Sequence, residues 1–212
     1  MKKSVLIAII IIAIIVVLGI IFIPSLLKDN KEPGKETPAV STSLEPVKSA
    51  EDLTKLVDKI YEGQNNLLPS LATQEIDITD ADMVQYVTGL KSASDIEFAV
   101  VSEPMMSSQA YSLILVKVKD GVNASEIAKQ MKDGVDTRKW ICVTAEKVYA
   151  TNSGNVVCLV MSSEEMAKPI YEKFKSLAGT VGEEFVRTEE TPEMPDDMMQ
   201  IPAEDGEMLT IN

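Results

Sequence analysis

The sequence predicts an α+β domain, a mixed four-stranded sheet with helices packed on it, preceded by one N-terminal transmembrane helix. Three observations support this fold class. An unbroken run of nineteen apolar residues occupies Val5 to Ile23. Apolar residues recur at helical spacing in residues 49–63 and again in residues 167–178. The segments between them are rich in β-branched residues, which favour strands.

The apolar run at the N-terminus has the length of a membrane span. As a helix it would extend roughly 28 Å, close to the roughly 30 Å of a bilayer's hydrocarbon core. Residues 1–27 are therefore predicted to be a transmembrane signal-anchor, with Pro24 ending the helix. The alternative is a cleaved secretory signal, because Lys2 and Lys3 precede the run. Such a signal has a shorter apolar region and a small-x-small cleavage site, and no such pattern follows here.

The flanking charges bear on which side of the membrane the rest of the chain lies. Lys2 and Lys3 favour a cytoplasmic amino terminus by the positive-inside rule, whereas Lys28, Lys31 and Lys35 oppose it. We expect a single-pass protein of the cell membrane whose soluble domain lies outside the cytoplasm. Residues 28–48 carry prolines and charges without an apolar period, and they are predicted to be a flexible linker.

Two helices are predicted at the start of the soluble domain. Ser49 and Asp52 resemble a capping pair, followed by one apolar helix face that ends at Gly63. After an irregular stretch at 65–77, Thr79 and Asp82 are expected to begin a short second helix that Gly89 ends.

For the remainder of the domain, the sequence predicts the order strand, strand, helix, strand, strand, helix. Strands are predicted at 95–102, 111–119, 143–151 and 155–162, the last two forming a hairpin. The helix from Asn123 to Met131 makes a right-handed crossover between the second and third strands. The last helix ends at Gly179 and has Pro169 in its first turn.

The two cysteines, Cys142 and Cys158, are predicted to be buried free thiols. In the expected hairpin Cys158 faces roughly Tyr149, which places Cys142 roughly 23 Å away. A disulfide would require the segment before the strand to fold back.

The predicted domain spans 49–181, and residues 182–212 are expected to be an acidic, methionine-containing, disordered tail. Met194, Met198, Met199 and Met208 raise the question of a metal. The tail has no histidine and no calcium-loop spacing, so we expect a solvated tail without metal or cofactor.

Composition excludes several functions. A net charge of −13 argues against nucleic-acid binding and against peripheral binding to anionic lipid. The chain has no histidine, which removes histidine general bases, Ser-His and Cys-His nucleophile pairs and histidine-containing zinc sites. No phosphate-binding glycine loop is present, and no catalytic residue is predicted.

One group of residues is a candidate binding patch. The predicted topology brings the loop 103–110 and the segment 133–141 to the same end of the sheet. A surface there would contain two methionines, an arginine and the lone tryptophan, which are frequent in protein interfaces: Glu103, Met105, Met106, Arg138 and Trp140. The structural interpretation is that Trp140 and the two methionines close the end of the sheet as core, and this is the one that we expect.

The segment EPMMSSQAYSLILVKVKDGVNASEIAKQMKDGVDTRKWICV and the hairpin NSGNVVCLVMSS carry a family resemblance. Over residues 47–179 the chain resembles an uncharacterised extracytoplasmic domain family of Gram-positive, clostridial-type bacteria that is often found in lipoproteins. The resemblance implies an exported, membrane-attached α+β domain and supplies no catalytic residues. This chain lacks a lipid-acceptor cysteine after its apolar run.

These observations favour a membrane-anchored extracytoplasmic module that binds a protein or envelope component without enzymatic activity. The alternative is a hydrolase that acts through paired carboxylates on a cell-wall or glycan substrate, which requires a cleft with two carboxylates roughly 5–9.5 Å apart. A structural spacer would show neither a cleft nor an apolar patch.

Overall fold

The computed structural model describes residues 44–64, 70–106 and 108–189. Within them lies one sheet of six strands in the order β1-β2-β3-β5-β4-β6, and every neighbouring pair is antiparallel. The strands are β1 (Leu71–Glu75), β2 (Ile96–Pro104), β3 (Ser112–Val118), β4 (Lys147–Ser153), β5 (Val156–Ser162) and β6 (Phe185–Thr188).

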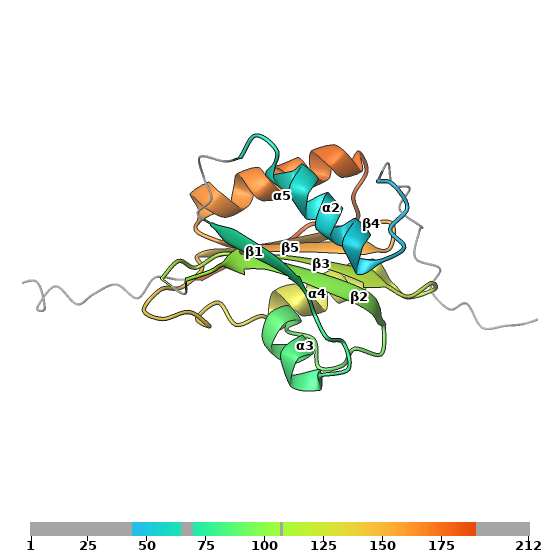
Figure 1. The fold of residues 1–212 in the computed structure, drawn as a ribbon, viewed down its shortest axis with the longest axis horizontal. Helices are drawn as coiled ribbons and strands as arrows, with labels where there is room; N and C mark the ends of the chain where they lie inside the picture. The colour runs from blue at the N-terminus through green and yellow to red at the C-terminus, as the bar shows by residue number, and fades with distance from the viewer. Residues whose placement is uncertain (1–43, 65–69, 107, 190–212) are drawn as a thin grey trace, which may run out of the picture. The chain divides into compact units, whose positions relative to one another are not determined.

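Helices cover both faces of the sheet. Helices α2 (Ala50–Tyr61) and α5 (Glu164–Ala178) lie on one face, and α3 (Ala81–Thr88) and α4 (Ala124–Gly134) lie on the other (Figure 1). Each layer has its own apolar core. Every residue of the central strands β3 and β5 is buried, because both of their faces are covered.

The prediction of a mixed four-stranded sheet is wrong. The tight turn at Gly154 pairs β5 with β4, and the free edge of β5 then pairs with β3. Strands β3 and β4 run in the same direction, as the crossover through α4 requires, but β5 lies between them, so no parallel pair forms. The two edge strands, β1 and β6, were not predicted from the sequence.

Within the ranges that the structure describes, no helix is long and apolar enough to cross a membrane. The predicted anchor at Val5 to Ile23, most of the predicted linker and residues 190–212 lie outside these ranges.

The helix starts follow local capping chemistry. Ser49 caps α2 and Asn123 caps α4, as predicted, through side-chain oxygens that accept backbone N–H groups. The start of α3 was misplaced by one residue, because Asp80 rather than Thr79 accepts the N–H groups of the first turn. Pro169 lies inside α5, five residues beyond Glu164, and not in its first turn.

The predicted hairpin is confirmed with a different register. Cys158 faces Thr151 rather than Tyr149, because the turn is one of the shortest possible. Cys158 is buried, as predicted, whereas Cys142 is exposed and has a positive φ of 61°.

The folded domain continues past the predicted boundary at 181. Arg187 in β6 donates hydrogen bonds to the carbonyl oxygens of Lys132, Asp133 and Val135, at 2.6, 3.1 and 2.8 Å. These carbonyls belong to the C-terminal end of α4, where carbonyl groups lack partners within the helix. Residues 182–189, which the sequence analysis assigned to the acidic tail, are therefore part of the domain.

Candidate functional site

The candidate site lies at the end of the sheet where β2 ends and β3 and β4 begin. Glu103 is next to last in β2, and Met105 and Met106 follow that strand directly. Arg138 and Trp140 lie in the loop between α4 and β4, which returns to this end because β3 and β4 run in the same direction. Figure 1 shows this loop and the turn after β2 at the same end of the sheet.

Lys139 joins these two segments. Its side chain is only 1% exposed, and its Nζ lies 2.5 Å from Oε1 of Glu103. The same carboxylate oxygen accepts a hydrogen bond of 2.7 Å from Oγ of Ser112. Apart from this ion pair, the ammonium donates no hydrogen bond to any described residue.

Two aromatic rings flank the Lys139 ammonium. Nζ lies 5.4 Å from the ring centroid of Tyr86 on α3 and 5.3 Å from that of Trp140. Both distances are within the range of cation–π attraction, which is stronger when the cation is removed from water. Lys139 therefore holds the loop against both α3 and β2, and its charge is neutralised inside the domain.

The segments joined by this pair, and helix α3 beside them, carry exposed apolar side chains. Met105, Met106, Ile141, Tyr86 and Met83 are 75, 73, 70, 55 and 42% exposed. They are five of the six large apolar side chains that are exposed in the described part of the chain, and the sixth is Val186 on β6. We call the group the Trp140 surface; its members are Met83, Tyr86, Met105, Met106, Trp140 and Ile141.

The structure thus brings the five predicted patch residues to one end of the sheet. The expectation that these residues close the end of the sheet as core is wrong for Met105 and Met106, which are exposed, whereas Trp140 packs partly against the core. Sequence reasoning missed Tyr86, Lys139 and Ile141. Tyr86 was predicted only as one of the apolar residues of a short helix, and its spacing from Met83 and Val87 gave no sign that its ring is exposed.

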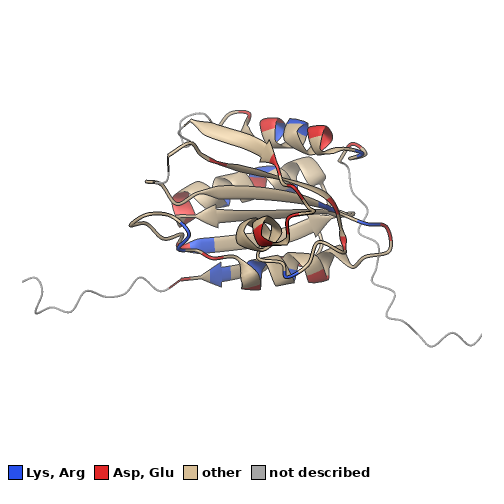
Figure 2. Cartoon of the chain, turned by 60° about the horizontal axis from the view of Figure 1, so that its bottom comes forward, with Lys and Arg blue, Asp and Glu red and all other residues tan. Residues whose placement is uncertain are grey.

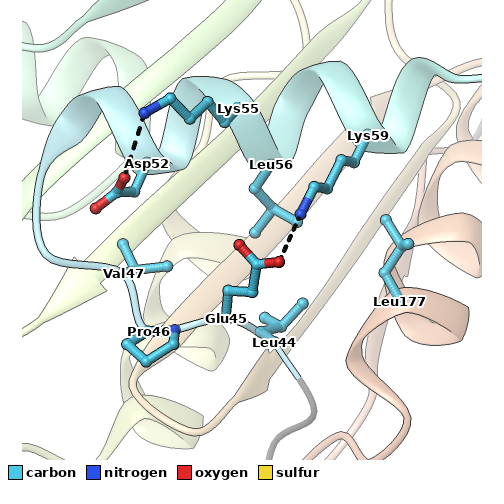
Figure 3. Close-up of a pocket in the computed structure, with 9 residues that line it drawn as sticks. All are labelled: Leu44, Glu45, Pro46, Val47, Asp52, Lys55, Leu56, Lys59 and Leu177. Carbon is cyan, nitrogen blue, oxygen red and sulfur yellow. Dashed lines mark ion pairs between the residues drawn. The ribbon is translucent and has the colours of Figure 1, made fainter.

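A second candidate is a groove of about 520 Å³ beside α2, close to where the described chain begins (Figure 3). Apolar side chains line it, among them Leu56 and Leu177. Its two carboxylates are paired with lysines: Glu45 lies 3.3 Å from Lys59, and Asp52 lies 3.7 Å from Lys55.

Asp52, one of the two groove carboxylates, is not tuned as a general acid. The backbone N–H of Lys48 donates a hydrogen bond to Asp52, which lowers the pKa of that carboxyl below its ordinary value. A general acid at neutral pH requires the opposite shift, as in a carboxyl whose pKa is raised by burial. Asp52 is thus suited to capping α2.

Two tyrosine hydroxyl groups, those of Tyr61 and Tyr111, meet at the end of α2. The Tyr111 hydroxyl donates to the Tyr61 hydroxyl at 3.1 Å. Burial raises the pKa of Tyr61 to about 12 and that of Tyr111 well above its ordinary value. Burial also raises the pKa of the Cys158 thiol, so this cysteine remains protonated and unreactive.

The described residues do not gather charge or metal ligands at the candidate site. Figure 2 shows acidic and basic residues intermixed over the helices and loops, while the central strands are mostly uncharged. No group of three or more cysteine, aspartate or glutamate side chains in residues 44–64, 70–106 and 108–189 is placed to hold a metal ion. The tail methionines lie outside these ranges.

No protein-family model, curated protein or solved structure matches this chain. The resemblance to an extracytoplasmic domain family therefore stays a prediction.

Proposed function

We propose that this protein is a membrane-anchored extracytoplasmic module that binds a protein partner through the Trp140 surface. One observation carries the proposal: of the six large apolar side chains exposed in the described domain, Met105 and Met106 follow β2 directly, Ile141 lies in the loop of Lys139, and Tyr86 lies over the Lys139 ammonium from α3, with Met83 one turn earlier on that helix. Scattered single apolar residues are ordinary on a protein surface, whereas a cluster of this kind is typical of an interaction site.

The residue types favour a protein as the partner. Tryptophan and tyrosine are enriched among the residues that dominate binding energy, and methionine adapts its shape to irregular surfaces. The net charge of −13 disfavours nucleic acid and anionic lipid.

The loop that carries Trp140 is held in place by contacts with the rest of the domain. The buried ion pair of Lys139 with Glu103 fixes the loop, and Trp140 packs partly against the core. A surface that is already ordered loses less conformational entropy on binding. The exposed methionines beside it supply the adaptable part of the contact.

Affinity capture with surface variants tests this proposal. A variant with Met105→Ser, Met106→Ser and Ile141→Ser should capture at least about tenfold less partner, because apolar contact area is removed. Its thermal stability should change little, since all three side chains are mostly exposed. Val186→Ser is the matched control, because Val186 is exposed but lies opposite Tyr149, which packs on the α2 and α5 side of the sheet, whereas Trp140 packs on the other side. Equal capture by the triple variant and the control would contradict the proposal.

The membrane anchor is a separate part of the proposal and rests on the apolar run Val5 to Ile23. We expect the protein to remain in the membrane fraction after extraction with alkaline carbonate, with its N-terminal residues intact. A mature protein recovered from the soluble fraction without its first twenty-odd residues would show that the run is a cleaved signal. No observation at the groove favours a hydrolase, and we do not propose one.

A further inference from the structure

We infer that a segment of this chain's own acidic tail, Asp196–Ile201, binds the Trp140 surface in cis and competes there with the partner. The inference rests on the proposed function, because it assigns a second ligand to the same surface. The segment reads Asp-Asp-Met-Met-Gln-Ile, two carboxylates followed by three apolar side chains and one amide.

The described chain ends against the segment that follows the loop of Arg138 and Trp140. The backbone N–H of Glu189 donates to the carbonyl of Glu146 at 2.8 Å, and the N–H of Ala145 donates to the carbonyl of Thr137 at 2.9 Å. Thr137 is the neighbour of Arg138. Two hydrogen bonds thus connect the start of the tail to the loop that carries Arg138 and Trp140, a separation on the order of 12 Å.

The hydrogen bonds of Arg187 to the end of α4 fix the position of this exit. They hold β6 against the residues that lead directly into the loop. The tail therefore begins at a defined point, at the same end of the sheet as the loop that carries Trp140.

The chemistry of the segment matches that of the surface. Arg138 is exposed, and its guanidinium forms no ion pair with the residues that the structure describes. Asp196 and Asp197 supply carboxylates for it, and Met198, Met199 and Ile201 supply apolar contacts for Tyr86, Trp140 and Ile141. Lys139 is already neutralised by Glu103, so Arg138 is the cation available to an acidic ligand.

The length of the connection suits binding in cis. Asp196 is seven residues beyond Glu189, which as a flexible coil spans roughly 13–16 Å. A short tether of this kind gives an effective concentration in the millimolar range, so a contact that is weak in trans would still be largely occupied in cis. A protein partner would then have to displace the segment.

A disulfide experiment on the full chain tests the contact directly. Cys142 is exposed within the loop and Cys158 is buried, so only the first is an accessible native probe. In a Gln200→Cys variant, kept in detergent and in a glutathione redox buffer, we expect an intramolecular disulfide between positions 142 and 200. It should form at least about tenfold faster than when Tyr86→Ser and Met105→Ser are added.

The comparison separates binding from random collision of a tethered chain. Equal rates with and without the two surface substitutions would overturn the inference, as would a disulfide that forms mainly between two molecules. Because Trp140 is the only tryptophan, its emission gives a second readout that needs no surface substitution. Replacing Met198 and Ile201 by serine should shift the emission of Trp140, and an unchanged spectrum would contradict the contact.

Partner capture distinguishes this inference from the proposed function. Full chain with Asp196→Asn, Asp197→Asn, Met198→Ser and Ile201→Ser should capture about three- to tenfold more partner, because competition in cis is removed. If capture is unchanged by these tail substitutions but is still lost with Met105→Ser, Met106→Ser and Ile141→Ser, the tail inference fails and the proposed function stands.

Discussion

Lys139 and Glu103 form a buried ion pair that joins the loop before β4 to the end of β2. The lysine side chain is almost fully buried, whereas the glutamate is one quarter exposed. The pair thus neutralises a cation inside the domain while it holds Trp140 at the surface. Its energetics are the first test of the site.

Removal of the glutamate alone should be costly. Glu103→Gln leaves the Lys139 ammonium buried without its counter-charge, and we expect the free energy of unfolding to fall by about 3 kcal/mol in urea denaturation. Adding Lys139→Met should restore most of the loss, because the uncompensated charge is gone. The control is Lys55→Met, which breaks an exposed pair with Glu51 and should cost less than about 0.5 kcal/mol. Losses that simply add in the double variant would show that the two residues are not coupled.

The packing of α3 against α4 depends on two glycines. A Cβ on Gly134 would lie 2.2 Å from the carbonyl oxygen of Gly89, which is a steric clash with the backbone. The clash can be relieved only if α3 and α4 move apart. Gly134→Ala should lower the free energy of unfolding by roughly 3 kcal/mol or more. Gly121→Ala is the control, because nothing lies within 4 Å of its Cβ and only its φ of +81° opposes the change, at about 1–2 kcal/mol. Similar losses at the two positions would contradict the close approach.

Arg187 is expected to be the residue that fastens β6. Arg187→Met removes three charge-assisted hydrogen bonds to the end of α4, and we expect a loss of about 2–3 kcal/mol in the free energy of unfolding. Hydrogen exchange should accelerate at the Val135 amide, which closes that helix end, and at β6. Arg187→Lys should recover little, because an ammonium cannot reproduce the forked geometry. Unchanged exchange at Val135 would contradict the capping role.

Alkaline pH should destabilise the domain through its buried tyrosines. In the folded state the pKa of Tyr61 is raised to about 12 by burial, whereas an unfolded tyrosine titrates near 10. Because the raised pKa favours the neutral form, this stabilising contribution is complete below pH 10 and is lost as the pH rises from about 10 to about 12.

Tyr61→Phe tests this dependence. The variant should be about 1 kcal/mol less stable at pH 8, since the Tyr111 hydroxyl loses its acceptor. Its stability should then fall less steeply than that of the unmodified chain between pH 10 and 12, as measured by urea denaturation at each pH. Parallel curves for the two proteins would show that Tyr61 does not contribute to the alkaline transition.

The parts of the fold that the sequence predicted are those fixed by local chemistry. Ser49 and Asn123 cap their helices because their side chains satisfy N–H groups only two or three residues away. The central strands were found because their residues are apolar almost throughout. The edge strands were missed for the opposite reason. Strand β1 pairs on one side only and is mostly exposed, and β6 has four residues within an acidic stretch.

The candidate site was predicted in outline although the sheet order was wrong. Glu103 and Arg138 come together because the crossover through α4 returns the chain to the same end of the sheet, whether or not β5 lies between β3 and β4. Lys139 was missed because a lysine in a polar loop gives no sign of burial. Its burial depends on Tyr86, more than fifty residues earlier in the chain, and only the folded structure places that ring over the ammonium.

Site-directed photocrosslinking in native membranes tests the central claim most directly. A photoreactive amino acid at Ile141 should crosslink to one protein partner, and the yield should fall at least about tenfold when Met105 and Met106 are replaced by serine. The same amino acid at Glu172 should give no such product, because Glu172 is exposed on α5, on the face of the sheet opposite to α3. A crosslink at Ile141 that is insensitive to the two serines, or equal yields at Ile141 and Glu172, would contradict the assignment of the Trp140 surface as the binding site.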